Sequence, residues 1–332
     1  MIPQHNLGVV VIGRNEGDRL QRCLLSVIAT TTCIVYVDSG STDDSVKMSR
    51  SLSVEVLTLD NSIPFTAARA RNAGFTRLLQ RYPQLKFVQF IDGDCEIASE
   101  WLEKAENKLL SQDDIAAVGG RLRERFPEKS PYNRLCDMEW DSPVGETKMC
   151  GGIAMMRVKA LQQVNGFNPD LIAGEEPELC VRLRQNDWKI FRIDAEMAFH
   201  DAQMLHFSQW WKRSIRNGYA YAEGAWLHGK PPECHWVRDT LRIWFWGLML
   251  PVLTISLATI TSGIGLILLG AYPLLFYRIA HNKQKEGKKA KDAYLYAFFC
   301  ILAKFPQLLG QIKFHLLRIR GQQSGLIEYK AN

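Results

Sequence analysis

The sequence lacks the cysteine spacings that mark a metal or redox site: it has no CxxC pair, and no cysteines and histidines are spaced as in a zinc site. Its 8 cysteines are scattered, several of them inside apolar stretches, where a free thiol packs as a small hydrophobic group. We therefore predict reduced, structural cysteines, as is usual in a reducing compartment. The chain also begins without a basic segment followed by an apolar one, so no export signal is expected there.

The body of the protein, up to Tyr277, also lacks an excess of basic residues. The 332 residues include 41 Lys and Arg against 35 Asp and Glu, and the basic excess falls in the segment after Tyr277. The first 230 residues contain no basic stripe interleaved with aromatic residues. This pattern argues against a nucleic-acid partner. A hydrophobic fraction of 47% excludes global disorder, and the length allows two domains.

Glycine-rich phosphate loops are absent as well. Neither GxGxxG nor GxxxxGK[ST] occurs, so the glycine-rich loops that commonly bind a dinucleotide or a nucleoside triphosphate are excluded. A nucleotide bound by this chain must therefore be held in another way. We expect carboxylates and a metal ion to hold it.

Apolar runs alternate with helical patterns in the first half of the chain. Leu20, Leu24, Val27 and Ile28 recur at helical spacing, and a second, looser pattern covers 67–79. Ser99 is a candidate N-cap for a third helix. The apolar runs have the length and β-branched content of buried parallel strands: Leu7–Ile12, Ile34–Val37, Val54–Leu59 and Phe87–Ile91. We predict an α/β fold with a doubly wound, mostly parallel sheet, which binds ligands beyond the carboxyl ends of its strands.

The most informative strand end is Asp92-Gly93-Asp94, directly after the buried run. Two carboxylates one residue apart point to the same side of the chain and can share a hard cation such as Mg²⁺ or Mn²⁺. The other positions of that cation accept diphosphate oxygens. The alternative is a solvated turn, since Asp and Gly favour turns in any case.

Several motifs, taken in order, resemble the family-2 glycosyltransferases of the GT-A fold over roughly residues 7–225. The resemblance implies inverting transfer of a sugar from a nucleotide-sugar donor to an acceptor hydroxyl. The motifs are VVVIGRNEGDRLQRCLLSV, VDSGSTDDSV, ARARNAGF, FIDGDCEI, GGIAMMRVKALQQVNGFNPDL and GEEPELCVRLRQNDWKI.

The resemblance also implies roles for individual residues. In the nucleotide-sugar site it implies that Asn15 and Glu16 line the nucleotide pocket and that Asp38 contacts the base or ribose. Arg71 would approach the diphosphate, and Asp92 would contact the ribose or the metal. Asp94 would be the principal metal ligand. Some GT-A enzymes complete the metal site with a histidine, here His200, which we place after a short strand over Lys189–Ile193; a structural histidine is the alternative.

A base must take the proton of the acceptor hydroxyl, and Gly174-Glu175-Glu176 supplies the candidates. The family usually has Glu-Asp here, with the Asp as base. This chain has Glu176 at that place, one methylene longer, so we expect Glu176 to be the base and Glu175 to bind the acceptor. The alternative is that these charges only complement the dipole of a helix N-terminus.

The end of the chain has a different character. Ile243–Tyr277 contains no charged residue, and Thr259–Gly265 interrupts it like a turn, so we predict a membrane hairpin. Basic residues flank both sides, which favours entry and return on the cytoplasmic side. Ala293–Leu317 is predicted as a third, kinked segment or as a helix in the membrane interface. The alternative is that both apolar stretches are buried helices of a soluble domain.

Together these features predict a GT-A catalytic domain over 1–230, with a nucleotide-binding half at about 1–120 and an acceptor half at about 121–230. Membrane-associated helices with a basic loop follow over 236–332. The predicted protein is a transferase of the cell inner membrane whose catalytic domain faces the cytoplasm. It would use a divalent cation and a lipid-linked or glycan acceptor. The alternative function is a glycosyltransferase-like membrane scaffold that binds nucleotide without turnover.

Overall fold

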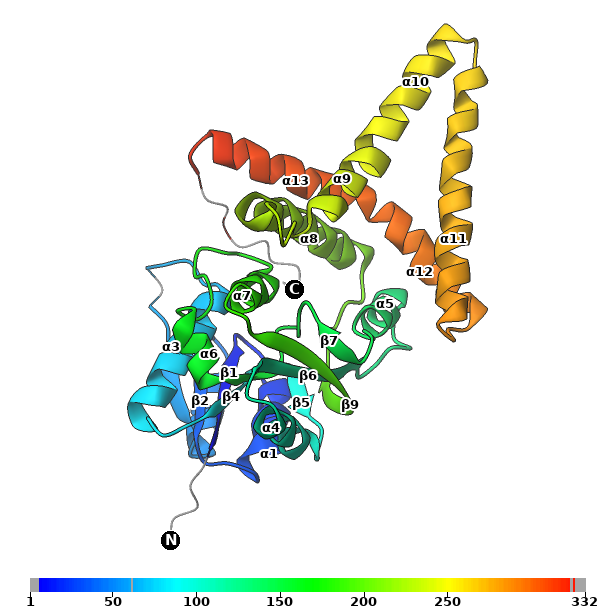
Figure 1. The fold of residues 1–332 in the computed structure, drawn as a ribbon. Coiled ribbons are helices and arrows are strands. Elements are labelled where there is room, and N and C mark those ends of the chain that lie inside the picture. Colours follow the sequence, from blue (N-terminus) through cyan, green and yellow to red (C-terminus); the bar gives the residue numbers. More distant parts are fainter. Residues whose placement is uncertain (1–5, 61, 323–324, 326–332) are drawn as a thin grey trace. The chain divides into compact units, whose positions relative to one another are not determined.

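The computed structural model describes residues 6–60, 62–322 and 325, and they form two compact units (Figure 1). The first unit comprises the residues up to Phe126 together with Glu139–Gln203. The second comprises Pro127–Met138 and the residues from Met204 onward. The predicted domain boundaries at 230 and 236 stay a prediction.

The first unit is built on one mixed sheet. In the described residues its strands are β1 (Leu7–Gly13), β2 (Ile34–Asp38), β3 (Glu55–Thr58), β4 (Phe87–Asp92), β5 (Cys95–Ile97), β6 (Ile115–Glu124), β7 (Gly145–Thr147), β8 (Ala154–Arg157) and β9 (Lys189–His200). Their order is β3-β2-β1-β4-β8-β6-β9-β5, with β7 paired to β9. Strands β3, β2, β1 and β4 are parallel, as are β6 and β9, whereas β8 runs antiparallel between β4 and β6.

Helices cover both faces of this sheet, as in a doubly wound fold (Figure 1). They are α1 (Asp18–Ile28), α2 (Ser45–Ser51), α3 (Ala67–Arg81), α4 (Trp101–Ser111), α6 (Val158–Gln163) and α7 (Glu175–Arg184). Alternate residues of β1 enter different cores: Val10 packs with α3, α6 and α7, and Val9 and Val11 pack with α1 and α4. The predicted α/β fold is confirmed. Its parallel part positions the carboxyl ends of β1, β2 and β4 at one edge.

Two local predictions differ from the structure. Helix α4 starts after Glu100, and no side chain caps it, so Ser99 is not its N-cap. The strand expected over Lys189–Ile193 continues to His200, because β9 pairs along its length with β6, β7 and β5. His200 therefore lies on a strand and is held by the pairing Cys95↔His200. Apolar periodicity does not predict this extension, because Asp194 and Glu196 interrupt the apolar pattern of β9.

The second unit is helical. Its elements are α5 (Pro131–Glu139, of which Glu139 belongs to the first unit), α8 (Phe207–His228), α9 (Val237–Trp244), η1 (Phe245–Met249), α10 (Leu250–Ile260), η2 (Ile264–Gly270), α11 (Ala271–Lys285), α12 (Ala290–Leu302) and α13 (Lys304–Ile319). The predicted turn is present, since α10 ends at Ile260 and η2 begins at Ile264. Helices α10 and α11 form a long hairpin that extends away from α8 and α13 (Figure 1).

The hairpin exposes apolar side chains. Ile260 and Ile267, on either side of the turn, are both 78% exposed, and Leu274 is 73% exposed. In the described part of the chain, three helical segments are long and apolar enough to cross a membrane: Val237–Ile260, Ile264–Lys285 and Ala290–Ile319. Exposed apolar surface of this extent marks a binding or membrane surface. The predicted membrane-associated region thus has the helices that such a role needs.

Glycines let α8 and α13 approach closely within the second unit. A Cβ atom added at Gly218 would lie 2.0 Å from the carbonyl oxygen of Gln307, and one added at Gly310 would lie 2.0 Å from that of Ile215. Small residues allow such backbone contact between helices, as in membrane helix pairs. Helix α8 therefore holds α13 along its length.

Replacing Gly310 by alanine should destabilise the second unit, because the added methyl group would force α8 and α13 apart. Overpacking costs typically about 1–3 kcal/mol, and backbone atoms have little room to yield. We expect the melting temperature of the full chain in detergent to fall by several degrees. Gly270→Ala is the matched control, since nothing lies within 4 Å of its added Cβ. Equal melting temperatures for the two variants would contradict this packing.

Candidate active site

The ends of β1 and β2 are joined by side-chain hydrogen bonds. Asn15 accepts from the Thr42 backbone N–H at 2.7 Å and donates its own N–H to the Ser41 hydroxyl at 2.9 Å. Its positive φ of 55° turns the chain sharply after β1. Asp38 is 1% exposed and accepts from the backbone N–H groups of Gly40 and Ser41 at 3.1 and 3.0 Å. These bonds give the loop after β2 a fixed shape.

Asp38 has a third internal partner, the hydroxyl of Tyr36 at 3.0 Å. Burial and the Asp38 carboxylate raise the pKa of Tyr36, so this phenol stays protonated and donates. The structure therefore shows Asp38 shaping the loop. Its predicted contact with the base or ribose stays a prediction. Glu16 pairs with Arg19 at 2.7 Å, and its Cγ would lie 3.4 Å from a Cβ added at Gly93. Glu16 is thus adjacent to the end of β4.

Arg71 connects two parts of the predicted site. Its guanidinium donates to Asp92, at the end of β4, at 2.8 Å and to Glu175, at the start of α7, at 2.7 Å. The arginine side chain is 3% exposed, against 38% for Asp92 and 12% for Glu175. Burial alone would lower the pKa of Arg71, but the carboxylates of Asp92 and Glu175 outweigh it and raise the pKa. The cation therefore persists and holds both carboxylates beside it.

The pocket of Arg71 is closely fitted. Its guanidinium carbon lies 5.6 Å from the centre of the Phe167 ring, and a Cβ added at Gly152 would come within 2.7 Å of its terminal nitrogen. Asn72, the next residue on α3, holds Phe167 by two hydrogen bonds of 2.7 and 2.9 Å to its backbone. Glycine is therefore needed at 152 to admit the arginine.

Asp94 and His200 also meet. The Nε2 atom of His200 lies 3.0 Å from Asp94 Oδ2, and Asp94 is 4% exposed. Cys95 adds a third donor atom, with its sulfur 3.5 Å from Asp94 Oδ1. Trp140 packs against the imidazole at 4.8 Å between ring centres. The donor atoms of Asp94, Cys95 and His200 all lie within 4.8 Å of one another, which is close enough to hold one metal ion.

The electrostatic field at this strand end is negative. Cys23 is buried on α1, with its sulfur 3.7 Å from the carbonyl oxygen of Asp92. Burial, followed by the carboxylates of Asp94, Asp92 and Glu16, raises the pKa of the Cys23 thiol well above its usual value. The same field that disfavours a thiolate favours a cation.

Glu176 lies at the start of α7, where Gly174 precedes the helix with a φ of 78°. Its side chain is buried, with 4% exposure of the residue. The Oε1 atom accepts from the Cys150 backbone N–H at 2.7 Å, the Cys150 thiol at 3.2 Å and the Cys180 thiol at 2.9 Å. The predicted base is therefore held in one orientation by two thiols.

The structure places the predicted residues in two neighbouring sets joined by Arg71. Asp92 belongs to the strand end that carries Asp94, and Glu175 precedes Glu176, so both clusters flank the same arginine. Sequence reasoning missed Cys95, Cys150, Cys180 and Phe167 as parts of this site. Only Cys180 gave a usable signal, since it follows Glu176 by one helical turn. The roles of the predicted residues stay predictions.

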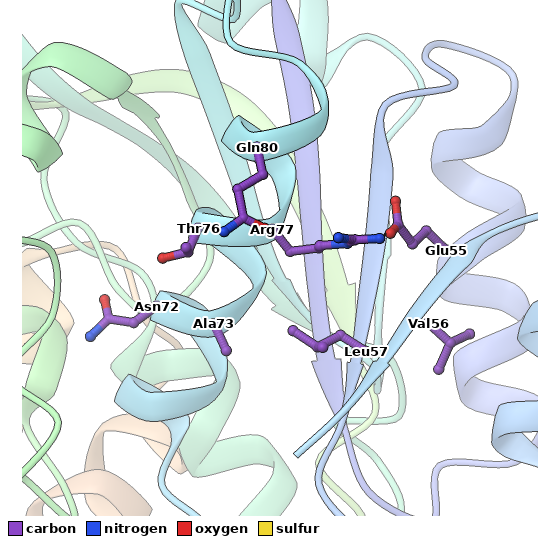
Figure 2. Close-up of a pocket in the computed structure, with 8 residues that line it drawn as sticks. All are labelled: Glu55, Val56, Leu57, Asn72, Ala73, Thr76, Arg77 and Gln80. Atoms are coloured by element: carbon purple, nitrogen blue, oxygen red, sulfur yellow. The ribbon is translucent and has the colours of Figure 1, made fainter. Parts of the chain in front are cut away.

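A hollow of about 470 Å³ opens elsewhere in the first unit, between α3 and β3 (Figure 2). Asn72, Ala73, Thr76, Arg77 and Gln80 line it from α3, and Glu55, Val56 and Leu57 line it from β3. In the figure, Arg77 reaches across toward Glu55, with which it forms an ion pair. The predicted site residues all lie in the described part of the chain, and none of them lines this hollow. We therefore base the site on the polar contacts described above.

Comparison with protein families gives two matches. The model of glycosyl transferase family 2 matches residues 8–164, and the model described as the N-terminal domain of galactosyltransferase matches residues 136–207. Among curated proteins, the glycosyltransferase AglE of Haloferax volcanii is 22% identical over 227 residues, covering 64% of this chain and 71% of AglE.

Two solved structures illustrate the fold. The mannosyltransferase PcManGT from Pyrobaculum calidifontis, solved with GDP-Man and Mn²⁺, has a TM-score of 0.60 at 16% identity and covers 93% of this chain and 87% of its own. Glucosyl-3-phosphoglycerate synthase from Mycobacterium tuberculosis, solved with Mn²⁺, UDP and phosphoglyceric acid, has a TM-score of 0.51 at 17% identity, with coverages of 68% and 80%. The fold of this chain is therefore that of GT-A glycosyltransferases.

Replacing Arg71 by methionine should cost up to about 3–5 kcal/mol of stability, because it leaves the mostly buried carboxylate of Glu175 and the more exposed one of Asp92 without their cation. Arg77→Met on the same helix is the matched control. Its side chain is 45% exposed in the pair with Glu55, and such a pair contributes about 0–1 kcal/mol. Thermal unfolding of both variants in detergent measures the difference. Losses of equal size would show that the Arg71 bridge does not hold the site together.

Proposed function

We propose that this chain, whose residues 8–164 match the glycosyl transferase family 2 model, transfers the sugar of a nucleotide-sugar donor with inversion at the anomeric carbon. The observation that carries the proposal is the Arg71 bridge. Arg71 pairs with Asp92, two residues before Asp94, and with Glu175, the residue before Glu176. An inverting transfer needs a stabilised leaving group and a base at one site.

The residues present fit a divalent cation. Asp94 offers a carboxylate oxygen and His200 an imidazole nitrogen 3.0 Å apart, and the Nδ1 atom of His200 has no hydrogen-bond partner among the described residues. We propose Mn²⁺ or Mg²⁺ here, since both PcManGT and the synthase were solved with Mn²⁺. When bound, such a cation stabilises negative charge on the departing nucleoside diphosphate.

The other steps fall to side chains of this chain. The bond between the anomeric carbon and the diphosphate oxygen breaks with its electron pair, while the acceptor oxygen forms the new bond from the opposite face. Arg71 stabilises the charge that develops on the diphosphate, because it is preorganised and buried. Glu176 takes the proton of the acceptor hydroxyl, and its hydrogen bonds from Cys150 and Cys180 fix its orientation.

The second unit suggests where the acceptor is found. We propose that α10 and α11 insert into the cell inner membrane as a hairpin and that the family 2 domain lies in the cytoplasm. Helix α13 packs on α8, which carries Lys212, Arg213 and Arg216, so α13 suits the interface better than a full span. A membrane-bound enzyme meets a lipid-linked or surface-glycan acceptor at high local concentration. This motivates such an acceptor for the transfer.

Substitution of Glu176 by glutamine should lower kcat by about 10²–10⁴-fold, because glutamine cannot take a proton. A screen of UDP-, GDP- and dTDP-sugars with Mn²⁺, read by release of nucleoside diphosphate, supplies the assay. Affinity for the nucleoside diphosphate should stay unchanged in this variant. Asp94→Asn should instead raise the Mn²⁺ concentration needed for half-maximal rate.

Two exposed residues provide controls for these variants. Glu103→Gln and Asp113→Asn change the same groups at the surface, and both should keep the full rate. A Glu176→Gln enzyme with the unaltered rate would remove Glu176 as the base. If Asp94→Asn left cellular function intact, a scaffold that binds nucleotide without turnover would become the better description.

The orientation can be tested with Cys234, which is exposed between α8 and α9. A membrane-impermeant maleimide should label it only after spheroplasts are permeabilised, because the flanking basic residues favour the cytoplasm. In a Cys234→Ser background, Ser262→Cys places a thiol in the hairpin turn, and it should be labelled in intact spheroplasts. Peptide mass spectrometry reads both. The reverse labelling pattern would show the opposite orientation.

A further inference from the structure

A second group of metal-ligand atoms surrounds Glu176. Cys180 follows Glu176 by one turn of α7, and Cys150 approaches from the segment between β7 and β8. The two sulfur atoms lie 3.8 Å apart, and Glu176 Oε1 lies 3.2 Å from the first thiol and 2.9 Å from the second. The three ligand atoms thus lie within 4.8 Å of one another, and all three residues belong to the first unit.

The spacing of the sulfur atoms fits a tetrahedral cation. Zinc–sulfur bonds of about 2.3 Å at a tetrahedral centre place two thiolates about 3.8 Å apart. Cys150 and Cys180 have this separation already. A disulfide needs its sulfurs about 2.05 Å apart, so the pair is too far apart to be bonded. The oxygen–sulfur distances are those of hydrogen bonds, and the carboxylate would withdraw by less than about 1 Å to share a cation.

The charges of the cluster also favour binding of a cation. The hydrogen bond with Cys180, burial and the Glu176 carboxylate raise the pKa of the Cys150 thiol. Burial, with a contribution from Glu176, raises the pKa of Cys180 to about 11. Both thiols therefore carry protons at neutral pH. A divalent cation would offset the charge of the Glu176 carboxylate and replace the thiol protons.

An ion can reach the cluster from solvent, and a nearby positive charge offsets part of its negative charge. Cys150 is only half-buried and follows the exposed residues Lys148 and Met149, so a hydrated ion can approach from that side. The guanidinium of Arg184 lowers the cost of negative charge on Cys180. With two thiolates, one carboxylate and a divalent cation, the site would carry one net negative charge beside that arginine.

We propose that Cys150, Glu176 and Cys180 form a binding site for Zn²⁺ or another thiophilic divalent cation. On binding, the ion exchanges water for two sulfur atoms and one carboxylate oxygen, two thiol protons pass to solvent, and a water molecule keeps the fourth position. No oxidation or reduction takes place. The site is separate from the cluster of Asp94, Cys95 and His200, which has one sulfur atom beside an oxygen and a nitrogen and therefore suits a harder cation than two thiols and a carboxylate do.

The binding site has a consequence for catalysis that rests on the proposed function. Glu176 is the proposed base, and a cation on its Oε1 would occupy the atom that takes the acceptor's proton. Zn²⁺ should therefore inhibit transfer under conditions in which Mn²⁺ or Mg²⁺ supports it.

The test is a titration of the full-length, reduced chain in detergent with Co²⁺, in the presence of excess Mg²⁺. Tetrahedral cobalt with thiolate ligands has charge-transfer absorption in the near ultraviolet and visible bands of its own. We expect both, and we expect stoichiometric Zn²⁺ to abolish them. The Cys150→Ser/Cys180→Ser variant should lose the charge-transfer band. Each single variant should weaken binding by at least about 10–100-fold, the cost of losing even an outer partner of a metal site.

Two cysteine variants serve as controls. Cys33→Ala removes a buried thiol outside both clusters, and Cys95→Ser removes the thiol beside Asp94; both should keep the cobalt spectrum. Circular dichroism checks that each variant is folded. A folded wild-type chain without the thiolate band overturns the site, and so does a band that survives in the double variant.

Rate measurements with Zn²⁺ separate this site from the proposed function. Inhibition, measured relative to each variant's own rate without Zn²⁺, should occur in the wild type and in Cys33→Ala and be lost in the double variant. If the cobalt spectrum is as expected but Zn²⁺ leaves the wild-type rate unchanged, the metal site stands and Glu176 is not the base. If the spectrum is missing, the metal site is wrong whatever the rate.

Discussion

A single buried guanidinium holds the site of this protein together. Arg71 reaches Asp92 at the end of β4 and Glu175 at the start of α7, two segments more than 80 residues apart in the chain. The desolvation of such a cation is costly, and only the two carboxylates make its burial tolerable. Gly152 leaves room for it, and Asn72 secures the aromatic ring beside it. One residue thus fixes the end of β4 to the start of α7.

The chemistry on the two sides of Arg71 differs. Asp94 and His200 present an oxygen and a nitrogen atom 3.0 Å apart, whereas Glu176 accepts hydrogen bonds from two thiols. The family's usual Asp is replaced here by a Glu whose carboxylate reaches the sulfurs of Cys150 and Cys180. Glu176 thus has two thiol partners, and these contacts are the basis of the proposed site for a soft metal.

The second unit obeys a different constraint. Helices α10 and α11 expose apolar side chains that water does not stabilise, while α8 and α13 pack through Gly218 and Gly310 with almost no side chain between them. The hairpin is therefore suited to lipid and the α8–α13 pair to protein contact. Since α8 carries several basic residues, this pair fits a membrane surface, where a lipid-linked acceptor would present its head group.

The sequence by itself determined the alternating strands and helices, the uncharged hairpin and the candidate residues Asp92, Asp94 and Glu176. Hydrophobic periodicity and turn chemistry are local, so they can be read from neighbouring residues. Only the tertiary structure decided that His200 lies on a strand beside Cys95, that Arg71 joins β4 to α7, and that Cys150 meets Cys180 at Glu176. These contacts depend on crossovers of the chain between distant strands, and no spacing in the sequence encodes which ends of the strands come together.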